Sequence, residues 1–227
     1  MRLILLRHEA RDSSDCSFSS RLTQKGIESA NTILKRELKK YTKDSSKLVI
    51  FSSPFIRCLE TILPYIKEKK SLIDCDYSIM ESLFPDKNGK YPEKYINIAT
   101  PHLSQLFEEL PESEQYINQK YPSLINNSIS MCTTDEQLNK RTLDFLKKRV
   151  IPIFKFYNNP QSTILICTHQ RVIQTIGPLI YNYFTNNSYN TDTSDDFKID
   201  MGSFYIYDSN SSQIVSKVVP LECEPSH

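Results

Sequence analysis

Short apolar runs alternate with amphipathic segments along most of the chain. The apolar runs have the length and β-branched content of buried strands, and they lie at residues 2–6, 47–53 and 162–168. Segments with helical periodicity follow them at 22–41, 53–70 and 170–184. Strands that alternate with helices form parallel sheets covered on both faces. We therefore predict an α/β fold, a three-layer sandwich with a mostly parallel sheet and helices on both faces.

The remaining segments complete a single predicted domain over residues 1–227. Alternating residues at 74–83 predict a third strand, and those at 197–219 predict two strands around a Ser/Asn turn. Residues 133–159 predict a long helix. Residues 84–130 are irregular and contain several prolines, so we expect an inserted, lid-like segment there.

Two residue patterns predict where helices begin. Thr23 precedes the first amphipathic segment and suits an N-cap, because its hydroxyl can accept from a free backbone N–H. Ser53 is followed by Pro54, which is favoured in the first helical turn. The second helix is therefore expected to start with Ser53 as its N-cap.

Charge and composition exclude several classes of protein. The 227-residue chain has a net charge of +1, without the basic excess typical of nucleic-acid-binding domains. It has no run of about 18 apolar residues, so we expect no membrane span, and its apolar start is too short for a signal peptide. The six cysteines are scattered without a C-x-x-C pair, which favours reduced thiols and a cytoplasmic protein.

Cationic side chains, imidazoles and a carboxylate stand at the ends of the predicted strands. The first strand runs into Arg7 and His8, the third carries Glu81, and the fourth ends at His169. Arg57 lies in the first turn of the helix after the second strand, and helical side chains lean toward their own N-terminus. Ligands of open α/β sheets bind beyond the carboxyl ends of the strands. We therefore predict one electropositive site at that edge, suited to a phosphate.

Five motifs carry the residues of this predicted site. They are "LLRHEAR" at 5–11, "LTQKG" at 22–26, "SSPFIRCLET" at 52–61, a glutamate on the next strand, and "ILICTHQ" at 164–170. In this order and spacing they resemble the histidine phosphatase superfamily, branch 1, and the resemblance covers nearly the whole chain. It implies the phosphoglycerate-mutase-like fold.

The resemblance also implies a role for each residue of the set. His8 would be the nucleophile that attacks phosphorus and forms a phosphohistidine. Arg7 and Arg57 would hold the phosphoryl oxygens through forked hydrogen bonds, and His169 would donate a further one. Glu81 would protonate the leaving oxygen and later accept a proton from water. We expect a metal-independent phosphoric monoester hydrolase without a cofactor, acting on a small phosphorylated metabolite or a phosphoprotein.

The chain departs from the family pattern near the expected nucleophile. Glu9 stands where the family usually has glycine, and Ser14 where the mutase members have asparagine. Gln170 follows His169, so the H-D pair of the acid-phosphatase branch is absent. The serine favours a phosphatase over a phosphoglycerate-type mutase. That mutase, and a catalytically weak phosphate-binding module of the same fold, are the alternatives.

Further side chains are candidates for the site or for its chemistry. Glu9 and Glu60 are alternatives to Glu81 as the acid. Imidazoles and a carboxylate would also suit zinc, but two arginines beside the cation would repel it, and we predict no metal. Four side chains are candidates for the substrate side of the site: Arg11, Ser14, Thr23 and Gln170.

Overall fold

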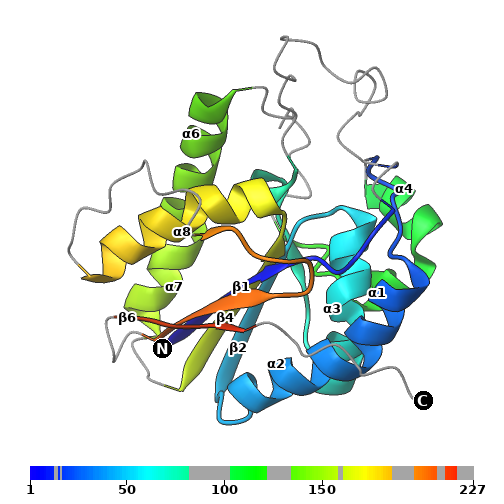
Figure 1. Cartoon of the computed structure of the whole chain (residues 1–227), viewed down its shortest axis with the longest axis horizontal. Helices are drawn as coiled ribbons and strands as arrows, with labels where there is room; N and C mark the ends of the chain where they lie inside the picture. The colour runs from blue at the N-terminus through cyan, green and yellow to red at the C-terminus, as the bar shows by residue number, and fades with distance from the viewer. Residues whose placement is uncertain are drawn as a thin grey trace.

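A six-stranded mixed sheet forms the centre of the protein (Figure 1). The computed structural model describes residues 1–12, 15, 17–81, 103–121, 134–157, 161–185 and 197–208, and the backbone of 213–218. The strand order is β3-β2-β4-β1-β5-β6. The strands are β1 (Arg2–Arg7), β2 (Lys47–Ser52), β3 (Asp74–Cys75), β4 (Ser162–Thr168), β5 (Phe204–Asp208) and β6 (Gln213–Val218).

The register of the parallel strands determines where the site can form. The neighbouring strands from β3 to β1 are parallel, and β5 and β6 continue the sheet in antiparallel pairing. At the carboxyl ends, Arg7 pairs with Thr168, and Ser52 pairs with Cys167. The residues that follow β1, β2 and β4 therefore emerge side by side at one edge of the sheet.

Helices cover both faces of the sheet (Figure 1). One layer contains α1 (Gln24–Ser29), the π-helical η1 (Ala30–Leu34), α2 (Lys35–Thr42) and α3 (Ile56–Lys69). The other contains α6 (Asp135–Phe145), the π-helical η5 (Leu146–Val150), α7 (Ile151–Phe156) and α8 (Gln170–Thr185). The predicted three-layer α/β architecture is confirmed. No helix in the described ranges is long and apolar enough to cross a membrane.

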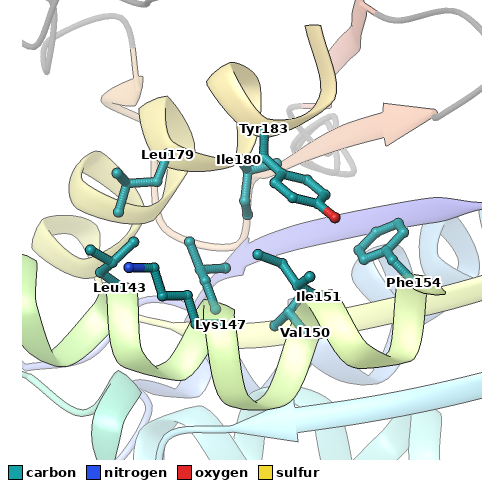
Figure 2. A pocket seen from close by; sticks show the side chains of 9 residues that line it. Leu143, Lys147, Val150, Ile151, Phe154, Leu179, Ile180 and Tyr183 are labelled. Carbon is teal, nitrogen blue, oxygen red and sulfur yellow. The ribbon is translucent and has the colours of Figure 1, made fainter. Parts of the chain in front are cut away.

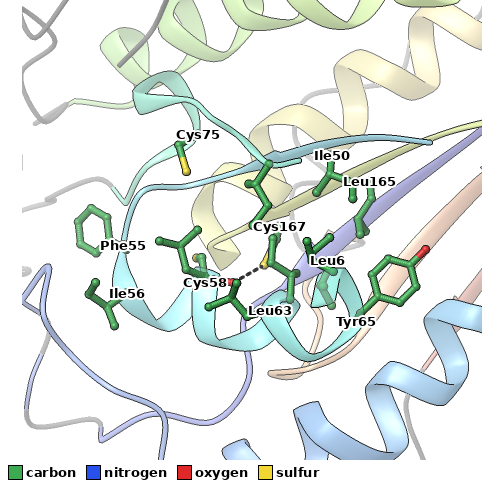
Figure 3. Packing of buried hydrophobic residues seen from close by; sticks show 14 of the residues in the cluster. Leu6, Ile50, Phe55, Ile56, Cys58, Leu63, Tyr65, Cys75, Leu165 and Cys167 are labelled. Atoms are coloured by element: carbon green, nitrogen blue, oxygen red, sulfur yellow. Dashed lines mark hydrogen bonds between the residues drawn. The ribbon is translucent and has the colours of Figure 1, made fainter. Parts of the chain in front are cut away.

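Alternate side chains of the strands build two separate cores. Ile4 and Leu6 of β1 face the α3 layer, where Leu6 packs among the buried residues of Figure 3. Leu3 and Leu5 point to the opposite face and pack with the α8 layer. Burying a side chain of this size stabilises the fold by about 1.5–3 kcal/mol. A register shift of one residue would exchange the two faces, so this packing holds the strand ends in place.

The segment expected as a strand over 74–83 is mostly not a strand. Only Asp74–Cys75 pairs with β2, and a 3-10 turn, η2 (Tyr77–Ile79), follows. The Asp76 carboxylate causes the change, because it caps this turn by accepting from the backbone N–H of Ser78 at 2.8 Å. The alternating pattern buries Tyr77 and Ile79 without a strand. Glu81 therefore follows a turn and does not lie on a strand.

The predicted start of the second helix is also wrong, whereas that of the first is confirmed. The α3 helix begins at Ile56, and its N-cap position is Phe55, without a side-chain cap. Ser53 and Pro54 precede the helix, and the Ser53 hydroxyl contacts His169 at 2.8 Å while it accepts a longer bond, 3.4 Å, from the backbone N–H of Phe55. Thr23 does cap α1, accepting from the backbone N–H of Gly26 at 3.1 Å.

In the later half of the chain, the helices differ in detail from those that the sequence predicted. The helix expected over 133–159 is three consecutive segments, α6, η5 and α7, capped by Thr134. Of the lid-like segment expected at 84–130, only 103–121 are among the described residues. They form α4 (Leu103–Glu109) and the 3-10 helix η4 (Pro111–Tyr116), and Leu106 is buried in the core under α3. A lid over the site stays a prediction.

Candidate active site

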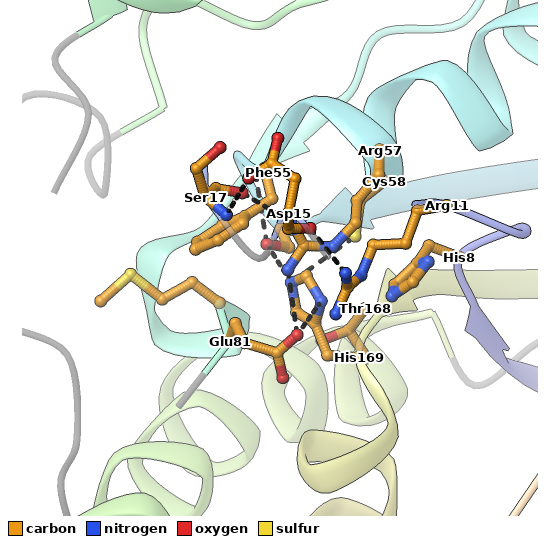
Figure 4. A network of polar contacts seen from close by, with 12 residues as sticks. His8, Arg11, Asp15, Ser17, Phe55, Arg57, Cys58, Glu81, Thr168 and His169 are labelled. Atoms are coloured by element: carbon orange, nitrogen blue, oxygen red, sulfur yellow. Dashed lines mark hydrogen bonds and ion pairs between the residues drawn. The ribbon is translucent and has the colours of Figure 1, made fainter. Parts of the chain in front are cut away.

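Two histidines meet at the carboxyl edge of the sheet (Figure 4). His8 follows β1 and His169 follows β4, and the backbone N–H of His8 donates to the Thr168 carbonyl at 3.0 Å. Their rings lie edge to face with centroids 5.3 Å apart. Only 3% of His8 and 0% of His169 are exposed. The pairing of β1 with β4 therefore fixes the separation of the two imidazoles.

The tautomer of His8 is set by the backbone. Its Nδ1 lies 2.8 Å from the carbonyl oxygen of Glu9, which can only accept a hydrogen bond. Nδ1 therefore carries the hydrogen and Nε2 the lone pair. Burial lowers the pKa of His8 well below its usual value, and the nearby charges of His169 and Arg57 lower it further. The result is a neutral imidazole, the form that can act as a nucleophile.

Arg57 brings a fully buried positive charge to the site. Its Nη2 donates to the Glu81 carboxylate at 3.0 Å and its Nη1 to the Ser17 carbonyl at 2.9 Å. The guanidinium also lies 4.5 Å from the centre of the Phe55 ring, in a cation–π contact. Its Nε is buried without a hydrogen-bond partner among the described residues. An unpaired donor on a buried cation is costly, and an anionic oxygen would satisfy it.

Arg7 supplies a second guanidinium at the last position of β1. Its Nη1 donates to the Ile199 carbonyl at 2.7 Å and to Oε1 of Gln170 at 3.2 Å. Its Nε, like that of Arg57, is buried without a partner in the described part of the chain. Two arginines that each keep a buried donor unengaged are suited to bind a phosphoryl group through charge-assisted hydrogen bonds.

Glu81 contacts both a cation and an imidazole. Its Oε2 lies 3.0 Å from Arg57 Nη2 and 3.1 Å from His169 Nδ1, and 22% of its side chain is exposed. Burial alone would raise the pKa of Glu81, but His169 and Arg57 outweigh burial and hold the pKa well below its usual value. In this arrangement Glu81 is ionised.

His169 is held from two sides. Its Nε2 lies 2.8 Å from the Ser53 hydroxyl and 3.6 Å from the Cys58 sulfur, and its Nδ1 faces Glu81. Burial would lower the pKa of His169, yet Cys58 and Glu81 together raise it. Ser53 is a residue of the candidate site that sequence reasoning missed. Its signal was the S-S-P pattern, which was interpreted as a helix cap.

Neither alternative acid contacts the histidines through its carboxylate. Glu9 is buried, and its Oε1 accepts from the Ser29 hydroxyl at 2.6 Å. Burial raises the pKa of Glu9. Glu60 binds Arg21 at 2.7 Å through Oε1 and accepts from the Leu22 backbone N–H through Oε2. Glu81 is the better candidate for the acid.

The four substrate-side candidates have different surroundings. Arg11 lies beside His8 in Figure 4, where its Nη1 donates to the carbonyls of Asp12 and Asp15. The Thr23 hydroxyl is engaged by two backbone groups, the Ala10 carbonyl and the Gly26 N–H. Gln170 contacts Arg7, as described above, and Ser14 lies outside the described residues.

The same residues include a set of metal-ligating groups. His8, Glu81 and His169 each offer a donor atom, and these atoms lie within 4.8 Å of one another. Imidazole and carboxylate donors suit zinc. However, the Glu81 oxygen is already paired with Arg57, and that buried cation would oppose a second positive charge. The fit to a metal ion is therefore poor, and metal independence stays a prediction.

Two pockets lie away from the histidines, in the helical layer formed by α6, η5, α7 and α8. One, of about 140 Å³, lies between α8 and the consecutive segments α6, η5 and α7, and its lining is mostly apolar (Figure 2). The other, of about 510 Å³, lies between α6 and α8 and includes the ion pair of Arg171 with Asp135. Neither contains a residue of the His8 and His169 set. Convergent charged groups, and not pocket size, locate the candidate active site.

The sequence matches no family model, and it matches no curated protein. Solved structures, in contrast, match over nearly the whole chain. The ecdysone phosphate phosphatase from Bombix mori, in complex with tungstate, is 14% identical with a TM-score of 0.67, covering 100% of this chain and 96% of that chain. A mycobacterial glucosyl-3-phosphoglycerate phosphatase, in complex with inorganic phosphate, is 13% identical with a TM-score of 0.56, covering 90% and 88%.

A third solved structure agrees with these two. The alpha-ribazole phosphatase from Shigella flexneri is 20% identical with a TM-score of 0.51, covering 91% of this chain and 89% of that chain. These structures are histidine phosphatase superfamily members. The phosphoglycerate-mutase-like fold that the motifs implied is therefore confirmed.

Proposed function

We propose that the protein hydrolyses a phosphate monoester through a phosphohistidine on His8. The observation that carries the proposal is the hydrogen bond from Nδ1 of His8 to the Glu9 carbonyl at 2.8 Å, which leaves the lone pair on Nε2. That nitrogen belongs to a buried imidazole in a site with two arginines. The fold supports the proposal, because the three solved structures described above, which share it, are phosphatases.

The first step transfers the phosphoryl group to the protein. Nε2 of His8 attacks phosphorus, the bond from phosphorus to the ester oxygen breaks, and the leaving oxygen takes a proton from Glu81. Arg7 and Arg57 direct their unpaired Nε–H groups to the phosphoryl oxygens, and His169 donates to them as well. Positioning and charge stabilisation of this kind supply most of what phosphoryl transfer requires.

Glu81 must gain its proton before it can act as an acid. A phosphoryl group that binds Arg57 and His169 competes with the Glu81 carboxylate for the same two partners. Once these cationic partners neutralise the phosphate, they no longer hold the pKa of Glu81 down, and burial raises it. Substrate binding is thus coupled to protonation of Glu81, with the proton coming from solvent or from a monoanionic ester.

The second step releases phosphate. Ionised Glu81 accepts a proton from a water molecule, whose oxygen attacks the phosphorus of phospho-His8. The bond from phosphorus to Nε2 breaks, and the lone pair returns to the imidazole. Inorganic phosphate leaves, and Glu81 releases the proton to solvent as its contacts with His169 and Arg57 form again.

The substrate class is proposed as a small phosphorylated metabolite or a phosphoprotein. The three solved structures described above are an ecdysone phosphate phosphatase, a glucosyl-3-phosphoglycerate phosphatase and an alpha-ribazole phosphatase, so their names share no compound beyond the phosphate. The residues of the candidate site likewise account for binding of the phosphoryl group and not of the rest of the ester. Serine at position 14 is the reason we favour hydrolysis over mutase transfer.

A labelling experiment tests the proposal. Purified protein should hydrolyse p-nitrophenyl phosphate, and a rapid quench with a ³²P-labelled ester should show acid-labile, alkali-stable label on His8. His8→Ala should lose both turnover and label while it keeps its far-UV circular dichroism. Label that survives in His8→Ala would remove this histidine from the role. A protein that binds phosphate without labelling or turnover would be the weak binding module.

Metal independence is tested in the same assay. Activity should persist in EDTA, because Arg7 and Arg57 supply the positive charge that a metal would otherwise provide. Activity that is lost in EDTA and restored by Mg²⁺ or Zn²⁺ would assign the chemistry to the His8, Glu81 and His169 donor set as metal ligands.

A further inference from the structure

We propose that Gln170 is a positioning residue that orients the Arg7 guanidinium toward the phosphoryl group without neutralising its charge. The inference rests on the phosphatase function proposed above. Gln170 is the first residue of α8 and follows His169 directly. Its side chain therefore starts at the same sheet edge as the two histidines.

The Gln170 carboxamide makes three hydrogen bonds, each with a partner of fixed polarity. Its Oε1 accepts from Arg7 Nη1 at 3.2 Å and from the backbone N–H of Ile199 at 3.0 Å. Its Nε2 donates to the Phe197 carbonyl at 3.0 Å. Because two partners can only donate and one can only accept, the amide has a single consistent orientation.

These contacts tie three separate parts of the chain together. Arg7 Nη1 donates also to the Ile199 carbonyl at 2.7 Å, so one nitrogen is held by both Gln170 and residue 199. Phe197 and Ile199 are at most 1% exposed and belong to the core under α8. The guanidinium is planar, so holding Nη1 sets the direction of its other donors, including the buried Nε.

The neutral amide matters because Arg7 and Arg57 are held differently. Arg57 is paired with a carboxylate, that of Glu81, at 3.0 Å. Among the described residues, no carboxylate lies within ion-pair distance of Arg7, whose Nη1 donates to the Gln170 amide and to a backbone carbonyl. A glutamate at 170 would have nearly the same shape as glutamine but would pair with Arg7 and compete with phosphate.

Two substitutions separate orientation from charge. Inorganic phosphate is titrated calorimetrically into the full-length protein. Gln170→Met removes the hydrogen bonds and should raise the phosphate Kd about 10-fold, whereas Gln170→Glu adds a competing charge and should raise it about 100-fold. KM for p-nitrophenyl phosphate should rise with Kd. Gln174→Glu, one turn further along α8, is the matched control and should stay within about 2-fold.

Gln170→Met also leaves two backbone groups without their partner, which is a structural effect independent of Arg7. A double-mutant cycle with Arg7→Ala separates this structural effect from an effect that acts through Arg7. If Gln170 acts through Arg7, then Gln170→Met should change the phosphate Kd less than about 2-fold in an Arg7→Ala background. An equal loss in both backgrounds overturns the proposal, as does an unchanged Kd in Gln170→Met itself. A wild-type protein that neither binds phosphate nor hydrolyses esters would instead refute the proposed function.

Discussion

Replacing Glu81 by glutamine is expected to tighten phosphate binding while it weakens catalysis. In the structure, the Glu81 carboxylate contacts Arg57 at 3.0 Å and His169 at 3.1 Å, the same groups that a phosphoryl group needs. Glutamine keeps the shape but removes the competing charge. Hydrolysis of an alkyl phosphate should fall about 10²- to 10⁴-fold with loss of the acid, and hydrolysis of p-nitrophenyl phosphate, whose leaving group needs no proton, should fall less.

The expected gain in binding follows from the buried ion pair. At a separation of 3.0 Å, unit charges attract by roughly 5 kcal/mol at an effective dielectric of about 20. Desolvation and the 22% exposure of Glu81 reduce the net value, and hydrogen bonds to charged groups contribute about 1.5–3 kcal/mol. Freeing Arg57 from Glu81 should thus lower the phosphate Kd about 10- to 100-fold.

The effect has a defined dependence on pH. His169 and Arg57 hold the pKa of Glu81 well below its usual value against the opposing effect of burial. We expect bound phosphate to raise that pKa, because it pairs with the same two groups. Wild-type binding therefore takes up a proton between these two pKa values, and its affinity falls as pH rises through that window. Glutamine has no such proton. The ratio of wild-type Kd to Glu81→Gln Kd should grow with pH, and the ionisation of phosphate itself cancels in this ratio.

Calorimetric titration of inorganic phosphate from pH 5 to 8 measures the ratio. Glu68→Gln is the matched control, because Glu68 is an exposed carboxylate on α3 paired with Lys39. Its phosphate Kd should equal that of the wild type at every pH. Equal or weaker binding by Glu81→Gln at pH 8 would refute the reasoning, since it would mean that the carboxylate orients Arg57 for phosphate and does not compete.

Three further substitutions test other parts of the site. Arg57→Lys should lower kcat/KM about 30- to 1000-fold, nearly as much as Arg57→Ala, because lysine lacks the forked donors; near-normal turnover by the lysine variant would contradict this. Ser53→Ala should lower kcat about 10-fold and shift the pKa of His169, as followed by NMR, because Nε2 of His169 loses the Ser53 hydroxyl at 2.8 Å. An unchanged titration of His169 would remove Ser53 from the candidate site. Gly202→Ala should lower the free energy of unfolding in urea by at least about 1–2 kcal/mol. Gly202 has a φ of 75°, and a Cβ there would lie 2.4 Å from Glu9 Oε1. An unchanged unfolding midpoint would show that alanine causes no strain at this position.

The sequence predicted that the two histidines lie together at the edge of the sheet, because each one ends an apolar run. The runs before His8 and His169 bury nearly every residue, as their composition suggested. A parallel pairing of such strands leaves little freedom for the residues that follow them. Arg57 was equally accessible to prediction, since the first turn of a helix points back at the sheet edge.

Other features depend on contacts between distant residues, which local patterns do not contain. Ser53 has the pattern of a helix cap, yet its hydroxyl contacts His169, 116 residues away. Glu81 was expected on a strand, but the Asp76 carboxylate caps a turn before it. Gln170 was assigned to the substrate side, because nothing near it in sequence indicates its contacts with Arg7 and Ile199.

The position of β4 between β1 and β2 has a consequence for synthesis on the ribosome. Chains are made from the N-terminus at about 5–20 residues per second, so β1 and β2 emerge well before Ser162–Thr168. Until then the two early strands have no shared neighbour, because β4 pairs with both of them. A nascent or truncated chain that ends before β4 thus carries His8 and Arg57 but has no parallel sheet centre to hold them together. Activity should appear only after the last quarter of the chain begins to emerge, and not gradually with length.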